Sequence, residues 1–109
     1  VCLLADRDLT SAGVEVNLLG EPARFPAGPA LLAARTGATL MPTVSYYDAD
    51  YTHMEFLPEI VVPTTGSLRE RVESVTQQWA DIVGRTAQAH PTDWHMLQRV
   101  WSADLVSVR

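Results

Sequence analysis

The chain has 109 residues, of which 47% are hydrophobic and 19% charged, and its formal net charge is −5. This composition is typical of one globular domain and excludes a disordered chain, and no apolar run reaches the ~20 residues of a membrane-spanning helix. All eight cationic residues are Arg and they are not clustered, so the acidic chain is a poor candidate for binding nucleic acid.

The chain opens with VCLLA, residues 1–5, an unbroken apolar run that predicts a strand buried on both faces. Because this run has no visible beginning, we expect the protein to continue upstream of it. Residues 6–13 predict a loop, and residues 14–19 predict a short strand closed by Gly20. The following GEPARFPAG, residues 20–28, predicts irregular structure because it holds two prolines and two glycines.

A short buried helix is predicted over PALLAARTG, residues 29–37. Pro29 suits its first turn, and Gly37 suits the left-handed residue after its end. Residues 38–47 and 51–57 then predict two strands paired across the turn DAD.

A second helix is the clearest element of the sequence, because Ser67 and Glu70 form a capping-box pattern at its start. Its predicted buried face carries Leu68, Val72, Val75, Trp79, Ile82 and Val83. His90 and Pro91 end this helix, and a last short helix is predicted over residues 91–101. The order of elements predicts an α/β fold, with a mixed sheet flanked by helices.

Three charged residues, Asp6, Arg7 and Asp8, follow the first predicted strand. In open α/β sheets, ligands bind beyond the carboxyl ends of strands. An Arg whose guanidinium is held by two flanking carboxylates is a candidate for binding an anion there. The alternative is a surface turn whose charges satisfy one another.

Two further sites depend on which face is open. Glu15 lies between Val14 and Val16, so it projects from the opposite face of the strand. In a cleft it could orient a histidine, whereas in solvent it is an ordinary surface residue. Gly28 leads into a helix N-terminus, whose free N–H groups attract anions, and Arg24 could add charge there. A tight turn explains the same residues.

The histidines give weak signals. His53 shares a strand face with Tyr51 and Glu55, which predicts a solvated edge. The stretch HPTDWH, residues 90–95, lacks the i, i+4 spacing of a helical zinc site, so no metal site is expected. The sequence also lacks a nucleophile elbow, a Walker-type phosphate loop and a dinucleotide glycine fingerprint.

The order of four blocks is more informative than any single motif. The blocks are VCLLADRDL, GVEVNLLGEPARFPAGPALLAARTGA, LMPTVSYY and HPTDWHMLQRVW. Together they resemble the bacterial lipid A biosynthesis (lauroyl/myristoyl) acyltransferase family over nearly the whole chain. The triplet Val14-Glu15-Val16 favours the actinobacterial branch that acts on phosphatidylinositol mannosides.

This resemblance implies an enzyme that moves a fatty acyl group from acyl-CoA or acyl carrier protein to a sugar hydroxyl of a glycolipid. It implies no bound cofactor beyond that co-substrate. It also implies a peripheral protein on the cytoplasmic face of the plasma membrane. Residues 1–109 would be the C-terminal half of a single glycerolipid-acyltransferase-like domain.

The resemblance also implies roles for individual residues. Arg7 matches an Arg that helps to hold an anionic substrate, between Asp6 and Asp8. Glu15 is similar to the acidic residue that supports the catalytic histidine. Phe-Pro-Ala-Gly, residues 25–28, matches the family's Phe-Pro-x-Gly block, but the side chains that bind phosphate there are absent. Only backbone N–H groups remain for an anion.

The general base of the family is the His of a His-x-x-x-x-Asp motif. None of the three histidines of this sequence is followed by Asp at that spacing. The motif lies upstream in the family, so we expect the chain alone to lack transferase activity. The alternative is a complete, non-catalytic module that binds a lipid or a partner protein, for which a cooperative melt of the 109 residues would be expected.

Overall fold

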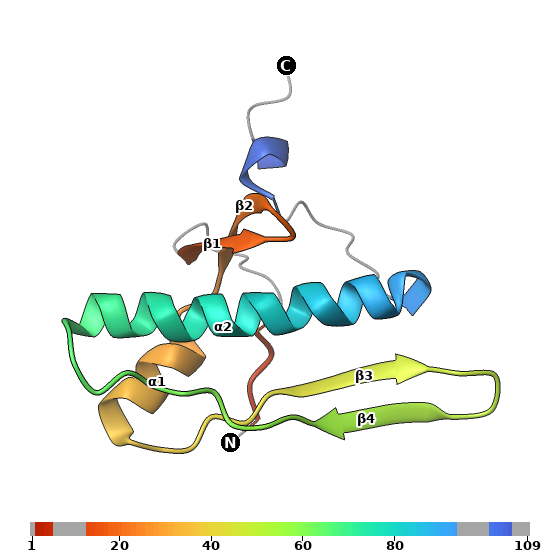
Figure 1. Ribbon diagram of the computed structural model, residues 1–109, viewed down its shortest axis with the longest axis horizontal. Coiled ribbons are helices and arrows are strands. Elements are labelled where there is room, and N and C mark those ends of the chain that lie inside the picture. Colours follow the sequence, from red (N-terminus) through yellow and green to blue (C-terminus); the bar gives the residue numbers. More distant parts are fainter. Residues whose placement is uncertain (1, 6–12, 94–100, 106–109) are drawn as a thin grey trace.

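The computed structural model describes residues 2–5, 13–93 and 101–105. The described residues form two β-hairpins, two helices and two short 3₁₀ turns: β1 (Val14–Leu18), β2 (Glu21–Phe25), α1 (Gly28–Thr36), β3 (Thr43–Tyr47), β4 (Thr52–Phe56), α2 (Leu68–Ala89), η1 (Pro91–Asp93) and η2 (Ser102–Leu105). Helix α2 runs through the middle of the molecule, with β1 and β2 on one side and α1, β3 and β4 on the other (Figure 1).

Apolar cores lie on both sides of α2. The core under β1 and β2 consists of Val16, Leu18, Ala23, Phe25, Ala80 and Val83, with Val14, Trp79 and Trp101 packed around it. The core under α1 is built on Ala30, Ile60, Val72, Val75 and Ile82. Because α2 contributes to both cores, it joins the β1–β2 hairpin to α1.

The β1–β2 hairpin corrects one prediction. Leu19 and Gly20 form its turn with φ of 54° and 88°, and positive φ at both positions suits a two-residue hairpin turn. The irregular structure predicted after this turn is therefore wrong over β2. Pro22 is tolerated because it lies opposite Asn17, whose backbone N–H and C=O bond the Gln77 side chain at 2.8 and 2.9 Å. The ladder needs no N–H from this proline.

Helix α1 confirms its predicted signals. Pro29 lies in the first turn, and Gly37 follows the last residue with φ of 74°. The Gly37 N–H bonds the Ala33 carbonyl at 3.0 Å, which satisfies a carbonyl that the helix end leaves free. Ala30 and Ala33 are buried, so small side chains allow α1 to lie close to its neighbours.

The β3–β4 hairpin also forms as predicted, although β3 begins at Thr43 rather than at residue 38. Pro42 has no N–H for a ladder, and its carbonyl accepts a bond from the Leu57 N–H at 2.9 Å. At the turn, the Asp48 carboxylate accepts the N–H groups of Asp50 and Tyr51 at 2.8 and 2.7 Å. A side chain therefore closes the turn.

Helix α2 begins at its predicted cap. The Ser67 hydroxyl accepts the Glu70 N–H at 3.2 Å, and the helix runs for 22 residues to Ala89. The predicted apolar face is buried at four positions and half-buried at Trp79, while Leu68 remains 38% exposed at the start of the helix. No helix in the described part of the chain is long and apolar enough to cross a bilayer.

The α/β class is confirmed, but the strands described form two separate antiparallel pairs rather than one mixed sheet. The strand predicted at the start of the chain is wrong for residues 2–5, which have no regular structure. Cys2 and Leu3 are exposed there, and Leu4 is 94% exposed. Two-residue and four-residue turns pair each strand with its sequence neighbour, and none of the strands described pairs with residues 2–5.

Candidate functional site

Glu15 projects from the outer face of β1, as the alternation of side chains predicts. Val16 and Leu18 are buried against α2, whereas Glu15 is exposed between them and Val14. In the antiparallel register, Glu15 lies directly opposite Arg24 of β2. The hairpin therefore presents a carboxylate and a guanidinium on the face that points away from the core.

The Arg24 guanidinium is oriented by the backbone. Its Nη1 donates a hydrogen bond to the Gly13 carbonyl at 3.1 Å, and the side chain is exposed. A guanidinium has five N–H donors, so this bond fixes its position and leaves donors for an anion. Of the two predicted substrate-binding residues that the structure describes, Arg24 and Gly28, Arg24 is the one that lies opposite Glu15.

Gly28 is the first residue of α1, and it is exposed. The preceding residue, Ala27, makes no side-chain hydrogen bond that caps the helix. Pro29 has no N–H, and the Leu31 N–H bonds the Ala27 carbonyl at 2.9 Å. The backbone N–H groups at the very start of α1 thus have no side-chain cap, and their binding of an anion stays a prediction.

Residues 94–100, which belong to the last of the four blocks, HPTDWHMLQRVW, lie outside the described residues, and so does the third predicted group, Asp6, Arg7 and Asp8. Their roles stay predictions. Trp101 is described: its indole N–H donates to the Leu18 carbonyl at 3.0 Å, which ties the end of the chain to β1.

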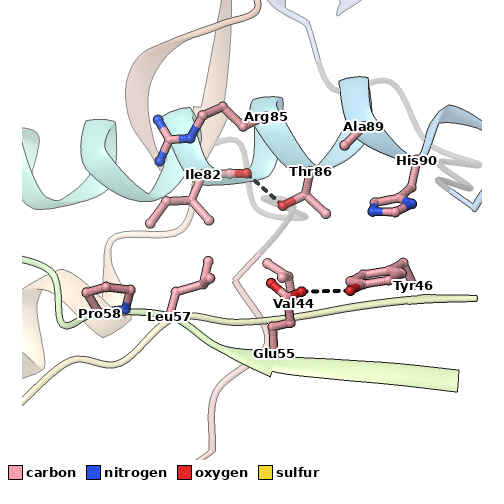
Figure 2. Close-up of a pocket in the computed structure, with 10 residues that line it drawn as sticks. All are labelled: Val44, Tyr46, Glu55, Leu57, Pro58, Ile82, Arg85, Thr86, Ala89 and His90. Carbon is pink, nitrogen blue, oxygen red and sulfur yellow. Dashed lines mark hydrogen bonds between the residues drawn. The ribbon is translucent and has the colours of Figure 1, made fainter.

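A groove that the sequence did not reveal lies between α2 and the β3–β4 hairpin (Figure 2). Its volume is about 400 Å³, and its lining is Val44, Tyr46, Glu55, Leu57, Pro58, Ile82, Arg85, Thr86, Ala89 and His90. The Thr86 hydroxyl donates a hydrogen bond to the Ile82 carbonyl at 2.9 Å, so it is not free to bind a ligand as a donor. Figure 2 shows the Arg85 guanidinium directed away from the hairpin. The groove therefore suits an apolar group better than a phosphate.

Tyr46 closes one end of this groove within a cluster of rings. Its ring stacks on His90 of the α2 end at 4.0 Å between centroids, and on His53 of β4 at 5.0 Å. The Tyr46 hydroxyl donates to Glu55 Oε1 at 2.6 Å. This hydrogen bond is the main reason why the pKa of Tyr46 is raised, so the phenol stays protonated.

The turn of the hairpin adds a carboxylate–imidazole pair to the cluster, since His53 Nε2 bonds Asp48. That bond, followed by those from the Asp50 and Tyr51 N–H groups, lowers the pKa of Asp48 to about 2. Asp93 in η1 accepts the Tyr47 N–H at 3.0 Å. The cluster joins the tip of the hairpin to the end of α2.

The predicted solvated edge holds for Tyr51, which is 71% exposed, and for the exposed Glu55, but His53 is half-buried and stacked on Tyr46. The missing information was the strand register: the turn also includes Tyr51, so Tyr46 lies opposite His53, whereas a turn of DAD alone would have put it opposite Thr52. Among the residues that the structure describes, no three His, Cys, Asp or Glu side chains are grouped to hold a metal ion. His95 lies outside those residues.

Comparisons with known proteins agree in pointing to one family. The family model described as "Bacterial lipid A biosynthesis acyltransferase" matches residues 1–103. A phosphatidylinositol mannoside acyltransferase of Mycobacterium tuberculosis is 46% identical over all 109 residues, which cover 33% of that protein. The protein of the same name from Mycolicibacterium smegmatis is 43% identical over 109 residues, or 34% of its length. The chain thus spans about a third of the length of the curated relatives it matches.

Proposed function

The chain belongs to the bacterial lipid A biosynthesis acyltransferase family, and on that ground we propose that the intact protein acylates a membrane glycolipid. The acceptor that we propose is a phosphatidylinositol mannoside, because relatives named for that activity align with the whole chain at 43 to 46% identity. The family match over residues 1–103 is the observation that carries this proposal.

The reaction is an acyl transfer from a thioester, acyl-CoA or acyl carrier protein, to a sugar hydroxyl. The hydroxyl oxygen attacks the thioester carbonyl, a C–O ester bond forms, the C–S bond breaks, and the thiol leaves. A general base removes the hydroxyl proton and returns it to the departing sulfur. The chain is proposed to be the C-terminal part of one domain, with the base on another part of the polypeptide.

Within this chain, Glu15 is the residue proposed to support that base. Its carboxylate would accept a hydrogen bond from the imidazole, fix its tautomer and stabilise its protonated form. The exposed position of Glu15 on β1 supports this role, because the imidazole of the base can reach its carboxylate there. Glu15 acts through the base, so it is a positioning residue.

Anion binding is the role proposed for the neighbouring groups. Arg24 lies opposite Glu15, and its guanidinium is oriented by Gly13. Arg24, Arg7 with Asp6 and Asp8, and the N–H groups at Gly28 would hold a phosphate of the donor or of the acceptor lipid.

We place the intact protein at the membrane surface, on the cytoplasmic face, as a peripheral protein. The support for this is chemical: the proposed acceptor is a membrane lipid, whereas both proposed donors are water-soluble. The groove between α2 and the β3–β4 hairpin adds an apolar site that would suit hydrocarbon.

The proposal is tested with the full-length protein, an acyl-CoA and phosphatidylinositol mannoside presented in vesicles. Mass spectrometry of the lipids measures the acylated product, and a thiol reagent measures the coenzyme A released. We expect both in equal amounts, and no product with phosphatidylinositol that lacks mannose. Binding of the mannoside without product from acyl-CoA or acyl carrier protein would refute the proposal in favour of a binding module.

A further inference from the structure

One face of the β3–β4 hairpin points away from α2. Side chains alternate along each strand, and Val44, Tyr46 and Glu55 line the groove on the α2 side. The register then gathers the remaining side chains of the two strands on the opposite side. We call this the outer face, and it consists of Thr43, Ser45, Tyr47, Thr52, Met54 and Phe56.

The outer face is uncharged, and its largest side chains are open. Tyr47 is 61% exposed, Met54 is 63% exposed and Phe56 is 69% exposed. Met54 lies opposite Ser45 and Phe56 lies opposite Thr43, so each large residue of β4 faces a small one of β3. The hairpin therefore cannot cover these two side chains by itself.

An open face of this kind needs a layer on top of it. Isolated two-stranded hairpins are marginally stable in water, and sheets gain stability when a further layer buries their apolar side chains. Gathered exposed apolar side chains mark interaction surfaces. On the other side, Val44 packs against the core under α1 and Tyr46 stacks on His90 at the end of α2.

The charges of the hairpin argue against a bilayer as this layer. Residues 43–56 include Asp48, Asp50 and Glu55, and no Arg or Lys. Asp48, whose pKa is lowered to about 2, is ionised at neutral pH. Anionic lipid surfaces attract basic segments and repel acidic ones. The chemistry therefore favours an uncharged protein surface.

We propose that the outer face is an internal interface of the full-length protein, covered by the part of the polypeptide outside this chain. About two-thirds of the length of the matched relatives lies outside the aligned region. A covalently attached segment is present at high effective concentration, which a second molecule lacks. This inference depends on the length of the family's proteins and not on the proposed acyl transfer.

Thiol labelling of the full-length protein tests this interface. Met54→Cys and Phe56→Cys place a thiol on the outer face, and Thr64→Cys is the matched control in the exposed loop before α2. A maleimide is added, and mass spectrometry follows modification of the peptide that holds each new thiol. We expect the outer-face thiols to react at least ~10-fold more slowly than the control, because they react only when the interface opens. Denaturant should abolish the difference.

Three results would overturn the proposal. Equal labelling rates would mean that the face is open, protection that requires vesicles of anionic phospholipid would assign it to a bilayer, and protection that grows with protein concentration would assign it to a second copy. Oxidation of the native Met54 by hydrogen peroxide gives the same comparison without a substitution. There we expect slow oxidation in the folded full-length protein and fast oxidation in denaturant.

Discussion

Arg71 joins the two helices, and its removal should destabilise the protein more than the loss of a surface charge. Its Nε donates to the Pro63 carbonyl at 2.9 Å, and its Nη2 donates to the Ala34 carbonyl at 3.3 Å. The Ala34 carbonyl belongs to the last turn of α1, where carbonyls have no partner within the helix. One half-buried guanidinium therefore satisfies α1 and the loop before α2.

The size of the effect follows from these bonds. Hydrogen bonds that involve a charged group contribute about 1.5–3 kcal/mol each, and the 3.3 Å bond belongs at the weak end. Arg71→Ala should therefore lower the free energy of unfolding by about 3 kcal/mol. Arg71→Lys keeps the charge but cannot span both carbonyls, so it should cost about half as much.

Arg69→Ala is the matched control on the same helix. Arg69 pairs with Glu73 at 3.0 Å, but its side chain is 88% exposed. Such a surface pair contributes at most about 0.5 kcal/mol. Urea unfolding of the full-length protein, followed by tryptophan fluorescence, compares the variants. If Arg71→Ala and Arg69→Ala agreed within about 0.5 kcal/mol, the bonds of Arg71 would not stabilise the fold in the way argued here.

Two further predictions concern the hairpins. Phe25→Ala should lower the free energy of unfolding by about 3–5 kcal/mol, because the ring is fully buried. Phe25→Leu keeps most of the side-chain volume and should cost less than half of that. Urea unfolding measures both variants, and equal effects would contradict the claim that the Phe25 ring fills the core. The lowered pKa of Asp48, about 2 against 3.8, predicts that the turn gains stability above pH 4 and loses it as the pH falls toward 2. Hydrogen exchange at the Asp50 and Tyr51 amides, corrected for intrinsic rates, should speed up as the pH falls from 4 toward 2. The control is Asp48→Asn, which keeps an acceptor oxygen but lacks the charge that attracts His53. If the exchange in this variant still depended on pH, Asp48 would not be the group responsible.

Local signals predicted α1 and α2 well, whereas the last helix, predicted over residues 91–101, is described only at Pro91–Asp93, which form a 3₁₀ turn, and at Trp101. Gly37 ends α1 because its left-handed conformation depends on that residue alone. Ser67 begins α2 through a bond to Glu70 only three residues away. By contrast, β2 was missed because it depends on a contact distant in the sequence. The Gln77 side chain hydrogen-bonds the backbone N–H and C=O of Asn17, so the strand tolerates Pro22, which has no N–H, at the opposite position.

In the candidate site, too, features that depend on one element were predicted, and features that depend on several elements were not. The outward direction of Glu15 follows from alternation within one strand, so the sequence predicted it. The stack of Tyr46 between His53 and His90 requires both the register of the hairpin and the placement of the end of α2, and no local pattern holds that information. The strand predicted for residues 2–5 failed because an apolar run does not specify its pairing partner.

Steady-state kinetics of Glu15→Gln in the full-length protein test the proposed mechanism most directly, with Glu15→Ala as the companion variant. The account predicts that kcat falls by about 100-fold while KM changes less than about threefold, because a group that supports the base acts in the transition state. It also predicts that the acidic limb of the pH profile moves to lower pH, because the protonated base loses its carboxylate partner. An unchanged kcat, or a change confined to KM, would contradict the account and remove Glu15 from the mechanism.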